Sequence, residues 1–99
     1  MKNELTLIDN EDAKSYQFII GDFQPKIEYI KTKEKIYLTH TEVPVELEGK
    51  GIGSHLVKLT LEDVEKKHLK LIPLCPFVAA YIKRHPEWNR LLETGFNIK

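Results

Sequence analysis

The sequence predicts an α+β fold, in which helices pack on a mostly antiparallel sheet. Four short apolar or alternating stretches, joined by brief polar turns, occupy the first part of the chain. Short turns between successive strands make the strands antiparallel neighbours. After Gly51 the apolar residues recur every three to four positions, as on one face of a helix. A fifth apolar stretch then leads into a second helical pattern, so we expect the order ββββ-α-β-α.

The strands are indicated by their composition and by the turns between them. The second stretch is β-branched and aromatic, and Gly21 and Asp22 form a turn signal after it. Pro44 ends the regular pairing of the fourth strand, and Pro73 places the fifth at an edge or at a point where pairing stops. We expect strands at residues 4–9, 15–20, 26–31, 35–43 and 70–74.

The helices have recognisable ends. Lys66, Lys67 and His68 lie where positive charge is favourable, near the negative pole of the first helix. Pro76 suits the first position of the second helix, and Pro86 breaks that helix. We expect helices at residues 54–68 and 76–85, and a last short one at 87–93.

Length and composition limit the classes of protein to which this chain can belong. Ninety-nine residues predict one domain, residues 1–99, with a hydrophobic content of 41% that is ordinary for a globular protein. Fifteen basic and fifteen acidic residues give zero net charge, which argues against a nucleic-acid partner. A single cysteine excludes an internal disulfide, and no apolar run reaches the roughly 20 residues of a membrane span. We expect a cytoplasmic monomer that binds no membrane.

The most informative stretch runs from Glu48 to Ser54 and holds three of the five glycines. A glycine-rich turn that opens a helix presents unpaired backbone N–H groups at the positive end of the helix dipole, which is a phosphate site made from main chain. The stretch does not fit a Walker A loop, and it departs from the dinucleotide fingerprint at Ser54. Gly51 and Gly53 fit the pyrophosphate loop of acyl-coenzyme A binders, Arg/Gln-x-x-Gly-x-Gly/Ala, including its place between the fourth strand and a helix.

Two segments, 42–56 and 75–88, resemble the GNAT superfamily of N-acetyltransferases. The second segment, which contains Cys-Pro-Phe-Val-x-x-Tyr and ends in His-Pro-x-Trp, is similar to a small single-domain subgroup of acetyltransferase-like proteins. The resemblance implies a truncated GNAT-like fold in which the fourth and fifth strands splay apart and acetyl-coenzyme A lies in the gap. The chain departs from the pattern at Glu48, where Arg or Gln is usual. It also has no room for the helices that usually follow the first strand, which predicts an open cleft.

The resemblance also implies a set of cofactor-binding residues. Loop amides would hold the pyrophosphate, the fourth strand would pair with the pantetheine arm, and Lys83 and Arg84 would meet the 3′-phosphate unless they are only a solvated helix end. The expected cofactor-binding residues are Val43, Val45, Glu48, Gly49, Lys50, Gly51, Ile52, Gly53, Ser54, Cys75, Pro76, Phe77, Tyr81, Lys83 and Arg84.

Four side chains are candidates for the chemistry. Cys75, at the start of the second helix, could attack the thioester or protonate the departing thiolate, or it could be an inert buried residue. His40 shares strand parity with Ile36 and is a possible general base if that face looks inward. Glu42 is a weaker candidate, because a bulge in this strand would reverse the parity beyond it. Tyr81 is a candidate acid by resemblance, with core packing as the alternative.

The oxyanion would be held by backbone N–H groups at the bulge of the fourth strand, which the resemblance places at Val43 and its neighbours. No spacing typical of metal ligands is present, so we expect no metal. The sequence therefore predicts an acetyl-coenzyme A-dependent N-acetyltransferase that acts on an amine of unknown identity. A non-catalytic coenzyme A-binding module and a small interaction domain are the alternatives.

Overall fold

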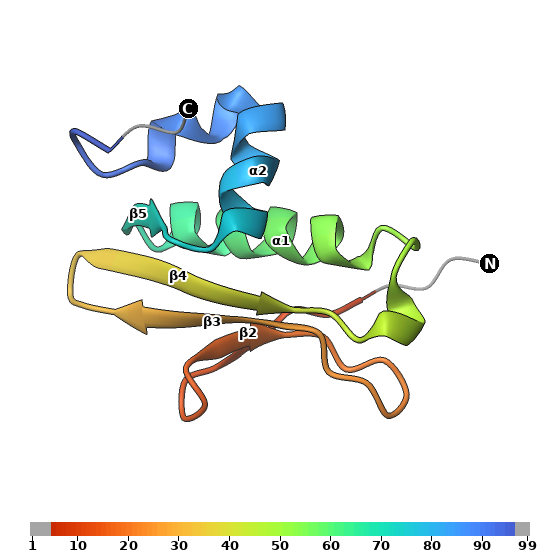
Figure 1. The fold of residues 1–99 in the computed structure, drawn as a ribbon. Helices are drawn as coiled ribbons and strands as arrows, with labels where there is room; N and C mark the ends of the chain where they lie inside the picture. The colour runs from red at the N-terminus through yellow and green to blue at the C-terminus, as the bar shows by residue number, and fades with distance from the viewer. Residues whose placement is uncertain (1–4, 97–99) are drawn as a thin grey trace.

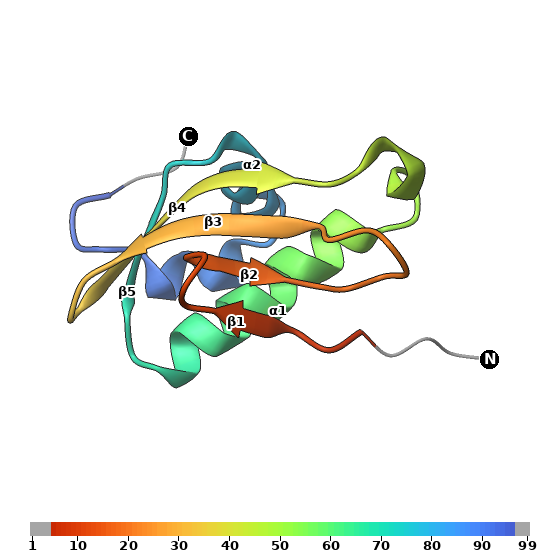
Figure 2. The same ribbon diagram turned by 90° about the horizontal axis from the view of Figure 1, so that it is seen from below.

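A computed structural model describes residues 5–96, which form one five-stranded sheet with helices on one face (Figure 1). The strands lie in the order β1-β2-β3-β4-β5, antiparallel except for the parallel pair β4 and β5. The view from below shows the opposite face of the sheet without a covering layer (Figure 2). The predicted fold class and the order ββββ-α-β-α are confirmed. The strands are β1 (Ile8–Asn10), β2 (Ser15–Gln17), β3 (Lys26–Lys31), β4 (Lys35–Glu42) and β5 (Lys70–Pro73), and the helices are η1 (Val45–Leu47), α1 (Ile52–Lys66), α2 (Pro76–Arg84) and η2 (Pro86–Leu91).

Strands β1 and β2 are about half as long as predicted, and β4 and β5 each end one residue before the expected end. β1 begins at Ile8, and residue 4, the expected start, lies outside the described residues. β2 ends at Gln17, three residues before the expected end. The ladder stops there because the residue opposite Phe18 is Pro25, which can accept the Phe18 N–H at 3.1 Å but has no N–H of its own to return.

Helix α1 begins two residues earlier than expected, because Gly51 adopts the left-handed conformation that starts it. It ends at Lys66, and His68 has a positive φ of 59° that no longer belongs to the helix. The short helix η1, between β4 and the glycine loop, was not predicted. Its single buried residue, Leu47, anchors the loop to the body of the protein.

The core lies between the helix-covered face of the sheet and the apolar side of α1 and α2. Fully buried aromatic and aliphatic side chains from both layers meet there, and each such side chain contributes roughly 1.5–3 kcal/mol when it is removed from water. The largest fully buried side chains are Tyr16, Phe18, Ile27, Ile36, Leu38, Leu56, Leu61, Leu71 and Ile82. Within this core, the hydroxyl of Thr60 on α1 is the one buried side-chain oxygen of the described residues that has no hydrogen-bond partner.

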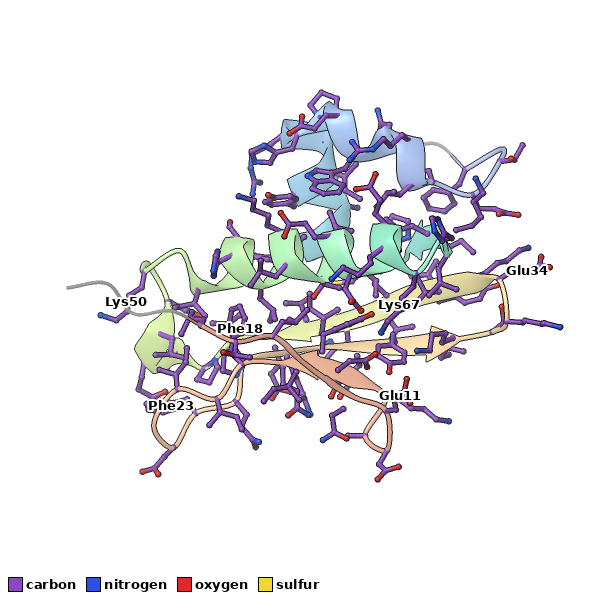
Figure 3. All side chains as sticks on the ribbon, turned by 180° about the vertical axis from the view of Figure 1, so that it is seen from behind. Glu11, Phe18, Phe23, Glu34, Lys50 and Lys67 are labelled. Atoms are coloured by element: carbon purple, nitrogen blue, oxygen red, sulfur yellow. The ribbon has the colours of Figure 1, made fainter. Side chains whose placement is uncertain are left out.

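A polar network ties the C-terminal end of α1 to the sheet. Lys67, labelled in Figure 3, lies 2.8 Å from both Asp9 and Asp63, and the Tyr16 hydroxyl donates to Asp63 at 2.7 Å. Burial by itself would raise the pKa of Asp63, but the hydrogen bonds from Lys67 and Tyr16 outweigh it and lower that pKa. This network fixes one end of α1, and the glycine loop lies at the other end.

Candidate functional site

Strands β4 and β5 separate after a short parallel ladder. The last pair is Leu38 with Pro73, and the Leu38 carbonyl then accepts from the N–H groups of Leu74 at 3.0 Å and Cys75 at 2.9 Å. β4 continues to Glu42, whereas the segment that follows β5 turns upward into α2 (Figure 1). The strands therefore splay apart, as the resemblance implied, and a gap opens between the end of β4 and the start of α2.

A hollow of roughly 470 Å³ occupies this gap. Its walls come from the end of β4, the glycine loop, the first turn of α1 and the start of α2. The lining residues are Thr41, Val43, Leu47, Glu48, Gly49, Gly51, Ile52, Gly53, Ser54 and Phe77. Glu48 is the one ionisable side chain among the described residues of this lining, so an anion in the hollow would be held by main-chain N–H groups and by the hydroxyls of Thr41 and Ser54.

The glycine loop presents such main-chain groups. Gly51 has φ 75° and ψ 10° as the N-cap of α1, and a Cβ there would meet no atom of the described residues within 4 Å. The first intrahelical hydrogen bond runs from the His55 N–H to the Gly51 carbonyl at 3.0 Å, and no side chain caps the helix. The N–H groups of Ile52, Gly53 and Ser54 lie in the first turn, where amides have no intrahelical acceptor. All three residues line the hollow.

Gly53 allows a close contact between the two helices. A Cβ at this position would lie 2.7 Å from Cζ of Phe77 and 3.4 Å from Cγ2 of Val43. Phe77, which is 40% exposed, therefore packs directly over the start of α1. Its ring forms an apolar wall between the glycine loop and α2.

Cys75 lies where the two strands diverge. It is the N-cap of α2, it is only 4% exposed, and its Sγ lies 3.1 Å from the Thr41 hydroxyl. Thr41 lines the hollow, so the thiol sits beside the wall of the hollow, at the point where β4 and α2 meet. Cys75 itself is not among the lining residues, and its contact with Thr41 is what connects the thiol to the hollow.

His40 and Glu42 do not face the core side, so the condition for His40 as a base is not met, and the bulge that weakened the case for Glu42 is present. Glu28 pairs with His40, whereas the next residue of β3 pairs with Leu38, so Thr39 is an extra residue in β4. This bulge reverses the parity beyond it. His40 and Glu42 are exposed on the uncovered face of the sheet, where Glu42 lies 3.8 Å from Lys26. Neither side chain points towards the hollow, and the bulge lies four residues before Val43, where the resemblance had placed the oxyanion amides.

Tyr81 also lies away from the hollow. Its ring is buried, and it stacks on His85 with the ring centroids 4.3 Å apart. Burial raises the pKa of Tyr81, and the negative charges of Glu87 and Glu62 raise it further. These neighbours belong to η2 and α1, so the structure supports the alternative, core packing, for this residue.

The remaining expected cofactor residues are not brought to the hollow. Lys83 and Arg84 lie in the last turn of α2, about 10–12 Å along the axis from its first residue. Val45 is 70% exposed on η1, and Pro76 is exposed at the start of α2. Lys50 projects from the loop at the outer end of α1 (Figure 3) and lines a different hollow.

Sequence reasoning missed Thr41 and Leu47 as parts of this site. Thr41 pairs with the buried Ile27 and so shares the helix-covered face, but only because of the bulge at Thr39. In the sequence, the alternating pattern assigned that face to His40. Leu47 gives no functional signal of its own, because its role is to anchor the loop from below.

None of the helices within residues 5–96 has both the length and the apolar character needed to cross a bilayer.

Sequence comparison relates this chain to known proteins. Protein NATD1 of Xenopus tropicalis is 37% identical over 54 residues, and those residues are 54% of this chain and 50% of the relative. Protein NATD1 of Homo sapiens is 39% identical over 54 residues, 54% of this chain and 48% of the relative. The matched stretch thus spans about half the length of these curated relatives. A sequence model described as GCN5-related N-acetyl-transferase matches residues 16–91, which include the whole splay, the glycine loop and α2. The chain therefore belongs to the GCN5-related N-acetyltransferase family.

Proposed function

We propose that this protein is an acetyl-coenzyme A-dependent N-acetyltransferase. The observation that carries the proposal is the hollow at the splay of β4 and β5, which joins the first-turn amides of α1 to the neighbourhood of the Cys75 thiol. Acetyl-coenzyme A has the matching features, an anionic pyrophosphate and a thioester connected by a narrow arm. Family membership supports the same co-substrate.

In this proposal the pyrophosphate binds at the start of α1. The N–H groups of Ile52, Gly53 and Ser54 would donate to phosphate oxygens, and the helix dipole would add to the attraction. Gly51 leaves the approach open because it has no Cβ. The carboxylate of Glu48 opposes binding, so the main chain supplies the affinity for the anion without help from a cation in the lining.

The pantetheine arm would extend from the loop along the open edge of β4, towards Thr41. Within residues 5–96 no strand pairs with that edge beyond Leu38, because the β5 ladder ends there. Val43 and Phe77 would cover the arm with apolar surface. This path leads the thioester to the place where Cys75 lies.

Two routes for the acetyl group fit this placement. In the first, Sγ of Cys75 bonds to the acetyl carbon, the bond from that carbon to the coenzyme sulfur breaks, and the coenzyme thiolate takes up the proton. The acceptor amine then attacks the new thioester, loses a proton, and releases the Cys75 thiol. In the second route the amine nitrogen bonds directly to the acetyl carbon, the bond from that carbon to the coenzyme sulfur breaks, and the departing thiolate takes up the proton that the amine loses. Cys75 then forms no covalent bond and lies only next to Thr41 of the site. His40, Glu42 and Tyr81 are not assigned a part in either route, because they point elsewhere.

The test is to incubate the protein with acetyl-coenzyme A, with and without a panel of small amines, and to follow both the intact protein mass and the acetylated amine. The first route predicts an acetyl mass increment on Cys75 without amine and its loss when amine is added. Cys75→Ala should then abolish transfer while cofactor binding is kept. The second route predicts no increment and partial activity in Cys75→Ser. Binding without any acetylated product would support the alternative, a coenzyme A-binding module.

A further inference from the structure

The Thr41 hydroxyl and the Cys75 thiol are hydrogen-bonded to each other. The backbone of Cys75 is itself held in place by hydrogen bonds. The Cys75 N–H donates to the Leu38 carbonyl at 2.9 Å, and its carbonyl accepts from the Ala79 N–H at 3.0 Å. Both peptide groups of this residue are thus held, one by β4 and one by α2. Rotation about the Cα–Cβ bond is the main freedom left to the thiol.

The hydrogen bond to Thr41 restricts this rotation of the Cys75 side chain. Its Oγ1 lies 3.1 Å from Sγ, and no other side chain among the described residues hydrogen-bonds to this thiol. A threonine side chain is β-branched and stiff at χ1, so its hydroxyl is held in place before any ligand arrives. The bulge at Thr39 is what turns this side chain, and not that of His40, towards the thiol.

We propose that Thr41 is a positioning residue that orients the Cys75 sulfur and donates a hydrogen bond to it when it reacts as a nucleophile. This inference rests on the proposed acetyl transfer for its purpose, but the contact can be tested without acetyl-coenzyme A. A neutral thiol can either donate to or accept from a hydroxyl, whereas a thiolate has no proton, so Thr41 must then be the donor. The Sγ proton passes to water before the sulfur bonds to the acetyl carbon, and the departing coenzyme thiolate takes up a proton from water.

The pair Thr41→Val and Thr41→Ser separates the hydroxyl from the shape of the side chain. Valine keeps the branched shape without the oxygen, and serine keeps the oxygen without the methyl group. A hydrogen bond to a charged group favours the charged form of that group by roughly 10-fold or more. The lower nucleophilicity of a stabilised thiolate offsets about half of this on a logarithmic scale. Alkylation of Cys75 should therefore slow by roughly 3- to 10-fold in Thr41→Val and return to within about twofold of the parent in Thr41→Ser.

The measurement is the rate of iodoacetamide alkylation of the folded, ligand-free protein, followed by intact mass. Thr60→Val is the matched control, because it removes the same atom from a buried threonine whose hydroxyl has no partner. It should leave the alkylation rate unchanged. Equal rates in the parent and Thr41→Val would overturn the inference, as would a serine variant that is as slow as valine.

A second arm keeps the inference separate from the proposed function. Each variant is incubated with acetyl-coenzyme A, and the rate of acetyl adduct formation is compared with the alkylation rate. If Thr41 positions the attacking sulfur, Thr41→Val should slow both reactions and Thr41→Ser should restore both. Slow alkylation in Thr41→Val with unchanged adduct formation would overturn the positioning role. A parent that is alkylated but forms no adduct would overturn the acyl-cysteine route, while the alkylation rates would still decide the contact.

Discussion

Replacement of Gly51 by alanine tests the glycine loop, because the structure separates its effect on stability from its effect on binding. Gly51 has φ 75°, and an alanine in the left-handed region costs about 1–2 kcal/mol. The smaller entropy of the unfolded alanine chain offsets roughly 0.4–1 kcal/mol of this cost. The free energy of unfolding should therefore fall by roughly 1 kcal/mol, without a steric clash, since no atom of the described residues lies within 4 Å of the new Cβ.

The effect of Gly51→Ala on binding should be larger. The added methyl group would stand where a phosphate approaches the first-turn amides, and loss of one hydrogen bond to a charged group costs about 1.5–3 kcal/mol. The affinity for acetyl-coenzyme A should thus fall by roughly 10- to 100-fold, measured by isothermal titration calorimetry well below the unfolding temperature.

The matched control is Gly21→Ala. Gly21 has φ 59° and equally open surroundings, but it lies in the turn after β2, outside the lining of the hollow. It should lose a similar amount of stability and keep the affinity of the parent within about twofold. Equal affinity in the parent and in Gly51→Ala would refute the idea that these amides hold the pyrophosphate. An equal loss of affinity in both variants would show that the effect comes from backbone strain and not from the position of Gly51.

Four further outcomes are expected. Glu48→Gln should raise the affinity for acetyl-coenzyme A by roughly 1.5- to 5-fold at low salt and by less at high salt, and a weaker affinity would mean that the carboxylate does not oppose the phosphates. His40→Ala should keep transfer activity within about twofold, because the imidazole lies on the uncovered face; a large loss would return His40 to the mechanism. Thr60→Val should raise the unfolding free energy by about 1–2 kcal/mol in chemical denaturation, and a destabilised variant would show that the hydroxyl has a partner. Asp63→Asn should have a lower free energy of unfolding than the parent at neutral pH, and this difference should shrink as the pH falls below 3.8, because a carboxylate with a lowered pKa stabilises the fold only while it is ionised. A difference in unfolding free energy that does not change with pH would contradict this.

The elements with a strong local signature were predicted most accurately from the sequence. Strand β3 has the expected bounds, and α2 begins at Pro76 as its proline predicted. The glycine loop was also identified, because a backbone with positive φ selects glycine and leaves that selection visible in the sequence. Gly51 and Gly49 both have such a backbone.

The bulge at Thr39 was the main feature that the sequence could not reveal. The residues around it, Thr39, His40 and Thr41, are all polar, so the alternation of apolar and polar residues carries no mark of the insertion. One extra residue exchanges the two faces of the strand. It moved His40 out of the candidate site and brought Thr41 into it.

The direction of α2 was equally hidden. The sequence shows that Lys83 and Arg84 end a helix, but not that this helix leads away from the splay. The start of α2 packs on α1 where Phe77 meets Gly53, and these residues are 24 positions apart in the chain. Contacts of this kind are set by packing between elements and not by local pattern.

Binding of acetyl-coenzyme A in the hollow at the splay can be tested by titrating the ¹⁵N-labelled protein with acetyl-coenzyme A and following its amide resonances. We predict that the largest shifts fall at residues 43–54, with a second group at residues 75–77, and that ligand at 100 times the dissociation constant stabilises the fold by about 2.7 kcal/mol. Resonances that stay in place at millimolar acetyl-coenzyme A, or shifts confined to the opposite end of α1, would contradict it.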